Sequence, residues 1–194
     1  GIHFLRGQPM LLGAFTLDLF SVLFAGAEAL LPVFATDILH VGAQGLGILR
    51  AAPAAGSVLM SVYLSHRPLR GRQGHILLVS VALYGLCISG FGLSPSFPLS
   101  VLLLALSGMF DNVSVVMRST LLQTLTPRNL LGRVAAVNAI FIGSSNEIGA
   151  FESGVAARLL GPVMAVVLGG FVPIAVTGTI AWRVPTLRKL ERIA

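Results

Sequence analysis

The sequence has little charge and almost no cysteine. Charged residues make up 10% of the chain, whereas a soluble domain normally carries about 25%. Hydrophobic residues account for 55% of the 194 residues, so too few charged side chains remain to cover a water-facing surface. The one cysteine, Cys87, cannot form a disulfide within the chain, and its apolar surroundings favour a small buried hydrophobe. We therefore expect a membrane protein without an internal disulfide.

Motifs of catalytic and metal sites are also missing from the sequence. It has no HExxH, G-x-S-x-G, Walker A or C-x-x-C pattern. The histidines lie in or beside the breaks between apolar runs, too dispersed for a metal cluster: His3, His40, His66 and His75. The net charge of +6 does not indicate nucleic-acid binding, because the basic residues lie in short gaps and form no continuous basic surface. We expect no enzyme activity, no metal, no cofactor and no nucleic-acid partner.

Apolar stretches long enough to cross a bilayer, which takes about 20 helical residues, fill most of the chain. There are six of them: residues 9–35, 44–65, 76–93, 99–122, 134–160 and 163–182. The breaks between them carry turn-forming residues, as at His40–Gly42, Ser94–Ser96 and Gly161–Pro162. The sequence therefore predicts an all-α membrane protein, with one six-helix bundle over residues 1–194.

The basic residues gather on one side of the bilayer if every stretch crosses it. Ten of the 13 lie there: Arg6, Arg67, Arg70, Arg72, Arg128, Arg133, Arg183, Arg188, Lys189 and Arg192. The loops on the opposite side contain no Lys or Arg. The positive-inside rule assigns the basic side to the cytoplasm, so we expect both ends of this segment in the cytoplasm.

Several charged residues lie inside the expected membrane helices. A charge at the centre of such a helix costs about 2.5–3.5 kcal/mol, so it usually faces a cavity or a partner. Our candidates for lining a transport cavity and for coupling are Asp18, Glu28, Asp111, Arg118, Glu147 and Glu152. A structural alternative stays open for Glu147 and Glu152, because Arg158 follows them in the next turns and could pair with them.

Spacing places some polar residues on one helix face. Ser107, Asp111, Ser114 and Arg118 follow one another in steps of four, three and four residues, which produces a polar stripe on a helix. Asp111 and Arg118 lie about 10 Å apart along the helix axis, so they pair only through movement or a bridge. Asp18 has no nearby partner in the sequence, and proton binding there is a hypothesis.

The third and sixth stretches contain no charged residue, so we expect them to face lipid on most sides. Two stretches with charged residues are thus followed by one without, and this order occurs twice along the chain. An odd number of helices per repeat inverts the second copy, an arrangement known from transporters. The sequence therefore predicts two inverted three-helix repeats.

Several segments resemble, in order and spacing, the motifs of a transporter family. Leu64–Gln73 resembles the basic loop motif that joins the second and third helices of each half in the major facilitator superfamily, with His66 near the place of its usual Asp. Thr126–Val134 is similar to the loop between helices ten and eleven in the branch of transmembrane secretion effectors, the enterobactin-exporter-like transporters. Other segments similar to this branch are Glu28–Asp37, Gly47–Pro53, Ser144–Gly149 and Phe151–Gly154.

This resemblance covers nearly the whole chain and implies helices seven to twelve of a twelve-helix transporter. It implies alternating access driven by ion or proton exchange, with efflux of a siderophore, a drug or another small amphipathic molecule across the bacterial inner membrane. The expected partners are the lipid bilayer, an N-terminal half that precedes this segment, and the small-molecule substrate. The cytoplasmic loops would contribute gating residues: Arg67, Arg70, Gly71, Arg72, Arg128, Gly132 and Arg133.

Two other functions stay open from the residues. The first is a non-transporting membrane subunit whose buried charges bind the helices of a partner. The second is a membrane enzyme that uses paired carboxylates.

Overall fold

The computed structural model describes residues 8–24, 27–67 and 73–183, apart from the side chains of Pro9, Met10, Phe24 and Gln73. Within these ranges the chain forms helices and no strand. In chain order they are α2 (Pro9–Phe24), η1 (Ala27–Leu30), α3 (Leu31–Val33), η2 (Phe34–Ile38), α4 (Gly42–His66), α5 (Gln73–Leu93), α6 (Phe97–Leu125), α7 (Leu131–Leu160) and α8 (Pro162–Arg183).

By length and composition, six helical segments in the described part of the chain can cross a membrane. They are Leu11–Ile38, Gly42–His66, Gly74–Leu93, Phe97–Leu125, Leu131–Leu160 and Pro162–Arg183. The all-α fold with six apolar helices is therefore confirmed. Each segment begins and ends within a few residues of the stretch expected from the sequence.

The first membrane segment is not one continuous α-helix, as a single apolar stretch had suggested. The α-helix α2 ends at Phe24, and a 3₁₀ turn, η1, precedes the short helix α3. Pro32 lies in the first turn of α3, where its missing N–H breaks no helical hydrogen bond. A π-helical turn, η2, completes the segment. Hydrophobicity predicts that a segment spans a membrane. It does not reveal local changes in helix type, because these changes leave the hydrophobicity of the segment unaltered.

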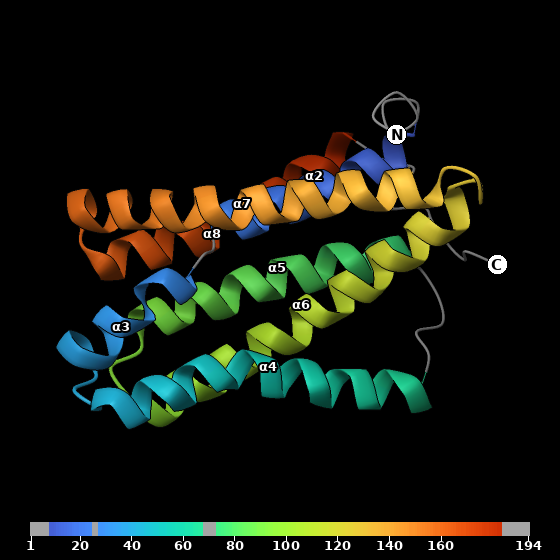
Figure 1. Ribbon diagram of the computed structural model, residues 1–194. Coiled ribbons are helices and arrows are strands. Elements are labelled where there is room, and N and C mark those ends of the chain that lie inside the picture. Colours follow the sequence, from blue (N-terminus) through green and yellow to red (C-terminus); the bar gives the residue numbers. More distant parts are fainter. Residues whose placement is uncertain (1–7, 25–26, 68–72, 184–194) are drawn as a thin grey trace.

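Left-handed backbone and proline separate the other helices. His40 and Gly42 have φ angles of 51° and 65° between η2 and α4, and Gly161 has a φ of 86° between α7 and α8. Pro98 and Pro162 occupy the first turns of α6 and α8. Figure 1 shows the long helices running side by side, with their connections alternating between the two ends of the bundle.

The helices pack in a chain of neighbours across the bundle (Figure 1). α7 packs against α2 and α8 on one side, α4 packs on α6 at the opposite side, and α5 lies between α8 and α6. One cluster of buried apolar side chains includes Leu11, Leu121 and Val134 near the end where α6 stops and α7 begins. A second cluster lies toward the other end and includes Phe34 and Phe91, whose ring centroids are 4.7 Å apart.

Glycines let neighbouring helices cross at backbone contact. A Cβ atom on Gly56 of α4 would collide with the backbone of Ala105, and one on Gly108 of α6 would collide with the carbonyl of Pro53. A Cβ on Gly149 of α7 would lie 2.8 Å from a carbonyl oxygen of α2. Small residues at such crossings allow close packing where lipid supplies no hydrophobic drive between helices. These crossings fix the spacing of the helices that carry the polar residues.

The uncharged helices α5 and α8 correct an expectation from the sequence. Among the described helices they have the largest buried shares, whereas α4 and α7 have the smallest. α5 and α8 contact each other closely at Gly85 and Gly170, and Ser89 Oγ donates a hydrogen bond of 3.0 Å to the carbonyl of Val167. The expectation that lipid surrounds α5 and α8 on most sides did not include this contact between them, although both keep exposed apolar side chains such as Leu86 and Phe171. Each uncharged helix packs part of its apolar surface against the other, and the freest faces belong to α4 and α7.

Candidate functional site: two cavities between the membrane helices

Two neighbouring cavities lie between the helices. The larger, about 700 Å³, is bordered by α2, η1, α4, α5, α6 and α7, and its walls include Glu28 and Tyr84. The smaller, about 270 Å³, lies between α2, α6 and α7. Val22, Asp111 and Asn146 line both cavities and form their common wall. We call the larger one the outer cavity and the smaller one the inner cavity, after the orientation expected from the basic loops.

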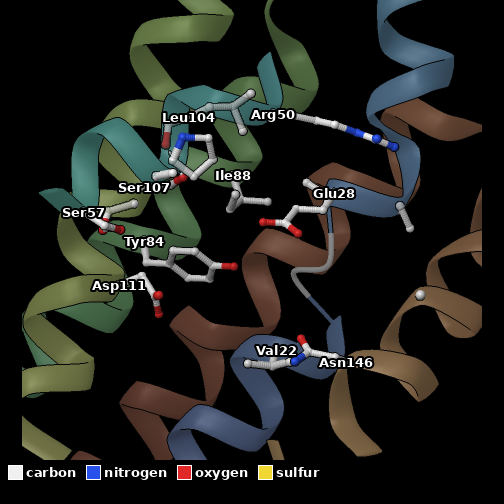
Figure 2. A pocket seen from close by; sticks show the side chains of 16 residues that line it. Val22, Glu28, Arg50, Ser57, Tyr84, Ile88, Leu104, Ser107, Asp111 and Asn146 are labelled. Atoms are coloured by element: carbon white, nitrogen blue, oxygen red, sulfur yellow. Dashed lines mark hydrogen bonds between the residues drawn. The ribbon is translucent and has the colours of Figure 1, made fainter. Parts of the chain in front are cut away.

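Side chains from three helices converge in the outer cavity, which Figure 2 shows. The Tyr84 hydroxyl of α5 points into its middle, the Asp111 carboxylate of α6 lies beside the tyrosine, and Glu28 of η1 faces them. Arg50 of α4 also lines this cavity. Within the described part of the chain, neither carboxylate forms an ion pair. Both carboxylates thus line the cavity without a salt bridge to another described residue.

An ion pair lines the inner cavity. Nη1 of Arg118 on α6 contacts the Asp18 carboxylate on α2, and these residues are only 8% and 7% exposed. Opposite charges in contact compensate each other, whereas one buried charge alone is strongly destabilising. The Arg118 Nε atom has no hydrogen-bond partner among the described residues. The pair ties the first membrane segment to the fourth.

The structure changes the interpretation of the stripe on α6. Asp111 and Arg118 both line the inner cavity, but Arg118 pairs with Asp18 and leaves Asp111 facing the outer cavity as well. Asp18 therefore does have a partner, contrary to the impression that its local sequence gives. The partner comes from a distant helix, which spacing along one helix cannot reveal.

Glu147 and Glu152 lie apart from these cavities. Glu147 is exposed and Glu152 is half-buried on α7, and neither lines the outer or the inner cavity. No ion pair joins either of them to Arg158 within the described ranges, so the pairing alternative is wrong. α7 presents Asn138 and Asn146 to the cavities instead.

The expected gating residues divide into two groups. Arg67, Arg128, Gly132 and Arg133 are exposed, near the ends of α4 and α6 and the start of α7. The other expected gating residues, Arg70, Gly71 and Arg72, lie outside the described residues, as do the basic residues Arg6, Arg188, Lys189 and Arg192.

Reasoning from charge alone missed polar residues of the outer cavity. Tyr84 lies in a stretch without charged residues. Its phenol group within this apolar run was the signal that could have identified it as a cavity residue. Asn146 lies two helical turns from Asn138, so their common face was also readable from spacing. In the described part of the chain, no group of three or more His, Cys, Asp or Glu residues could hold a metal ion.

Curated relatives are similar to most of the chain. It is 33% identical to the enterobactin exporter of Citrobacter koseri over 172 residues, which covers 87% of this chain and 40% of that protein. It is 30% identical to the enterobactin exporter of Escherichia coli O1:K1 over 171 residues, which covers 88% of this chain and 41% of that protein. The chain thus spans about two fifths of the length of these relatives. No protein-family model and no solved structure matches it.

These relatives are named as exporters and not as enzymes, in agreement with the missing catalytic motifs. The membrane-length helices make the chain a multi-pass membrane protein, and their number fits a C-terminal half of a facilitator fold. As a homologue of the enterobactin exporters, the chain belongs to the major facilitator superfamily.

Proposed function

We propose that this chain is the C-terminal half of an exporter that moves a siderophore-like or similar small amphipathic molecule across the bacterial inner membrane. The observation that carries the proposal is the outer cavity, about 700 Å³ in volume, with charged side chains between membrane helices. Cavities of about 300–1,000 Å³ suit small-molecule ligands. The relatives named as enterobactin exporters support an exported substrate of this kind.

An N-terminal half would cover the free faces of this bundle. α4 exposes Val58 and Leu59, and α7 exposes Phe141 and Phe151. Lipid can cover apolar side chains, but the exposed Glu147 between them on α7 favours a polar or protein neighbour over hydrocarbon. Glu147, with Glu152, therefore faces the cavity between the two halves in this proposal.

Helix packing supports two inverted repeats. If α2 to α5 and α6 to α8 are related by a pseudo-twofold axis, the first helix of one repeat packs on the second helix of the other. α2 packs on α7 and α6 packs on α4, and the third helices, α5 and α8, pack on each other. Such a symmetric bundle can rock against an N-terminal half as a unit, which is the motion that alternating access requires.

Protons would couple to transport through the charges between α2 and α6. A proton on the Asp18 carboxylate neutralises it and weakens its ion pair with Arg118, which frees α2 and α6 to separate. Asp111 lines both cavities, so its carboxylate can take part in proton exchange and in substrate binding. In this proposal both ends of this segment lie at the cytoplasmic face, where the basic loops contribute gating residues.

The free faces of α4 and α7 also favour a second candidate function. In this alternative the chain is a non-transporting membrane subunit, and these faces bind the helices of a partner protein.

Flux measurements distinguish the two functions. The protein, purified from its full coding sequence and reconstituted into liposomes, should move an amphipathic substrate when a pH gradient is imposed. The double variant Asp18→Asn/Asp111→Asn should lose gradient-driven flux. Asp37→Asn is the matched control, because Asp37 is an exposed acid that lines neither cavity. Flux that survives in the double variant contradicts the coupling residues, and the absence of flux from the wild type for every candidate favours the subunit.

A further inference from the structure

Three charged side chains share the inner cavity, and two of them are acids. Asp18 of α2 and both Asp111 and Arg118 of α6 line it, and Arg118 is the one cation in the lining that the structure describes. The polar residues that α7 contributes, Asn138 and Asn146, are neutral. The inner cavity therefore holds two acids for one arginine, and Asp111 is the acid that has no ion pair among the described residues.

The Arg118 guanidinium is anchored on one side only. Its contact with Asp18 uses Nη1, and its Nε has no hydrogen-bond partner among the described residues. Side chains on a helix point back toward its N-terminus, and on α6 this is the direction of Asp111, two turns before Arg118. The two residues lie about 10 Å apart along the helix axis. Within this cavity of about 270 Å³, a water molecule can bridge the gap that the two side chains leave.

We propose that Arg118 is a counter-ion shared by Asp18 and Asp111, and that its guanidinium moves to Asp111 when Asp18 takes up a proton. The proposal rests on the proton coupling proposed above and adds the residue that receives the arginine. In the first state Arg118 joins α6 to α2. In the second state it pairs within α6, directly or through a water molecule.

This exchange allows the link between α2 and α6 to open at low cost. An arginine left alone among buried groups is strongly destabilising, and it does not lose its proton. Asp111 offers a second carboxylate in the same cavity, so the buried charge stays compensated while the link opens. Proton uptake by Asp18 then also changes the charge of the outer cavity, because Asp111 belongs to the wall that both cavities share.

On its other side, Asp111 faces the titratable groups of the outer cavity. These are Glu28 of η1, Arg50 of α4 and Tyr84 of α5. Figure 2 shows the Glu28 carboxylate and the Tyr84 hydroxyl directed toward the space beside Asp111. None of the three lines the inner cavity, so the exchange between Asp18 and Asp111 depends on Arg118.

Thermal unfolding of the purified full-length protein in detergent tests the exchange, with Asp111→Asn introduced into three backgrounds at about pH 8. In the wild type this substitution should leave the apparent unfolding temperature unchanged or raise it, because Asp111 holds no ion pair with a described residue there. In the Asp18→Asn variant it should lower the temperature by about 2 °C or more, because Arg118 loses its second partner. In the double variant Asp18→Asn/Arg118→Gln this loss should disappear. Asp18→Asn itself remains destabilising, since it removes the link between α2 and α6 and Asp111 recovers only part of that loss.

Two outcomes of this comparison overturn the proposal. The first is an equal effect of Asp111→Asn in all three backgrounds, which shows that Arg118 does not transfer. The second is a loss that persists without Arg118, which assigns the effect to the two acids alone. Asp37→Asn is the matched control, because Asp37 is an exposed acid that lines neither cavity, and its small effect should be the same in each background.

A pH series keeps the proposal testable if Asp18→Asn fails to fold. With Asp18 intact, acidification supplies its proton, so Asp111→Asn should become less stable than the wild type as the pH falls from about 8 to about 5. Without the exchange, Asp18 and Arg118 stay paired and Asp111→Asn only imitates a protonated Asp111. The variant would then be at least as stable as the wild type at every pH, and that result overturns the inference. The absence of flux from the wild type contradicts the export function instead, because the exchange is judged by stability alone.

Discussion

The Arg118 guanidinium and the Asp18 carboxylate form a buried ion pair between α6 and α2. Its two members come from the first and fourth membrane segments, which the chain separates by two complete spans. The pair therefore stabilises the packing of these segments and also places a protonatable group against the inner cavity.

The two charges should depend on each other in a double-mutant cycle. Asp18→Asn leaves an unpaired buried arginine, which costs about 3–5 kcal/mol and cannot be relieved by loss of the arginine proton. Arg118→Gln should be less destabilising, because the remaining Asp18 can become neutral by taking up a proton. The double variant Asp18→Asn/Arg118→Gln should be more stable than Asp18→Asn alone. Apparent unfolding temperatures in detergent measure all three, and strictly additive effects would contradict the pairing.

The crossing of α4 and α6 should be intolerant of a methyl group. Gly108→Ala places a Cβ against the carbonyl of Pro53, and separating the helices should lower stability by about 1–3 kcal/mol. Gly143→Ala is the control, because no atom lies within 4 Å of a Cβ built there. Its stability should stay the same or rise, since alanine is a better helix former than glycine. An equal loss of thermal stability in the two variants would show that the helices at this crossing are less tightly packed than described.

The hydrogen bond between the uncharged helices should make a measurable contribution. Ser89→Ala removes the donor to Val167 and should lower stability by about 0.6 kcal/mol, the average for hydrogen bonds between membrane helices, and by at most about 1.7 kcal/mol. Ser21 is a matched control, because it is also buried but donates to Leu17 within its own helix. Ser21→Ala should therefore affect stability less. The reverse order in thermal unfolding would contradict a stabilising bond between α5 and α8.

The orientation proposed from the basic loops can be measured by cysteine labelling in a Cys87→Ala background. Asn129 and Ser96 are both exposed, in turns at opposite ends of the bundle. With a membrane-impermeant maleimide, Ser96→Cys should react in intact cells and Asn129→Cys only after the cytoplasmic face is opened. Labelling of Asn129→Cys in intact cells would reverse the assigned topology.

Much of the fold was predictable because bilayer thickness imposes the length of an apolar run, and turn chemistry marks its ends. Gly161 illustrates this, because its positive φ lies at the break expected between the fifth and sixth stretches. The burial of α5 and α8 was not predictable from their lack of charge, because lipid and another apolar helix accept the same side chains. Choosing between them takes knowledge of contacts such as that between Gly85 and Gly170.

The site was predictable in part. Intramembrane charge identified Asp111 and Arg118, both of which line a cavity. Helical spacing could not show that Arg118 pairs with Asp18, because that contact joins segments that are distant in the chain. Tyr84 was missed because its side chain is neutral, although its hydroxyl occupies the middle of the outer cavity.

The wall shared by the two cavities has a consequence for protein engineering. A substitution at Val22, Asp111 or Asn146 alters both compartments at once, so the substrate binding and the energy coupling that we propose for them cannot be redesigned separately there. Positions that border one compartment alone permit independent adjustment. Leu104 belongs to the outer cavity and Ser119 to the inner one. A mutant library aimed at new cargo would therefore begin at residues such as Leu104 and keep the common wall intact.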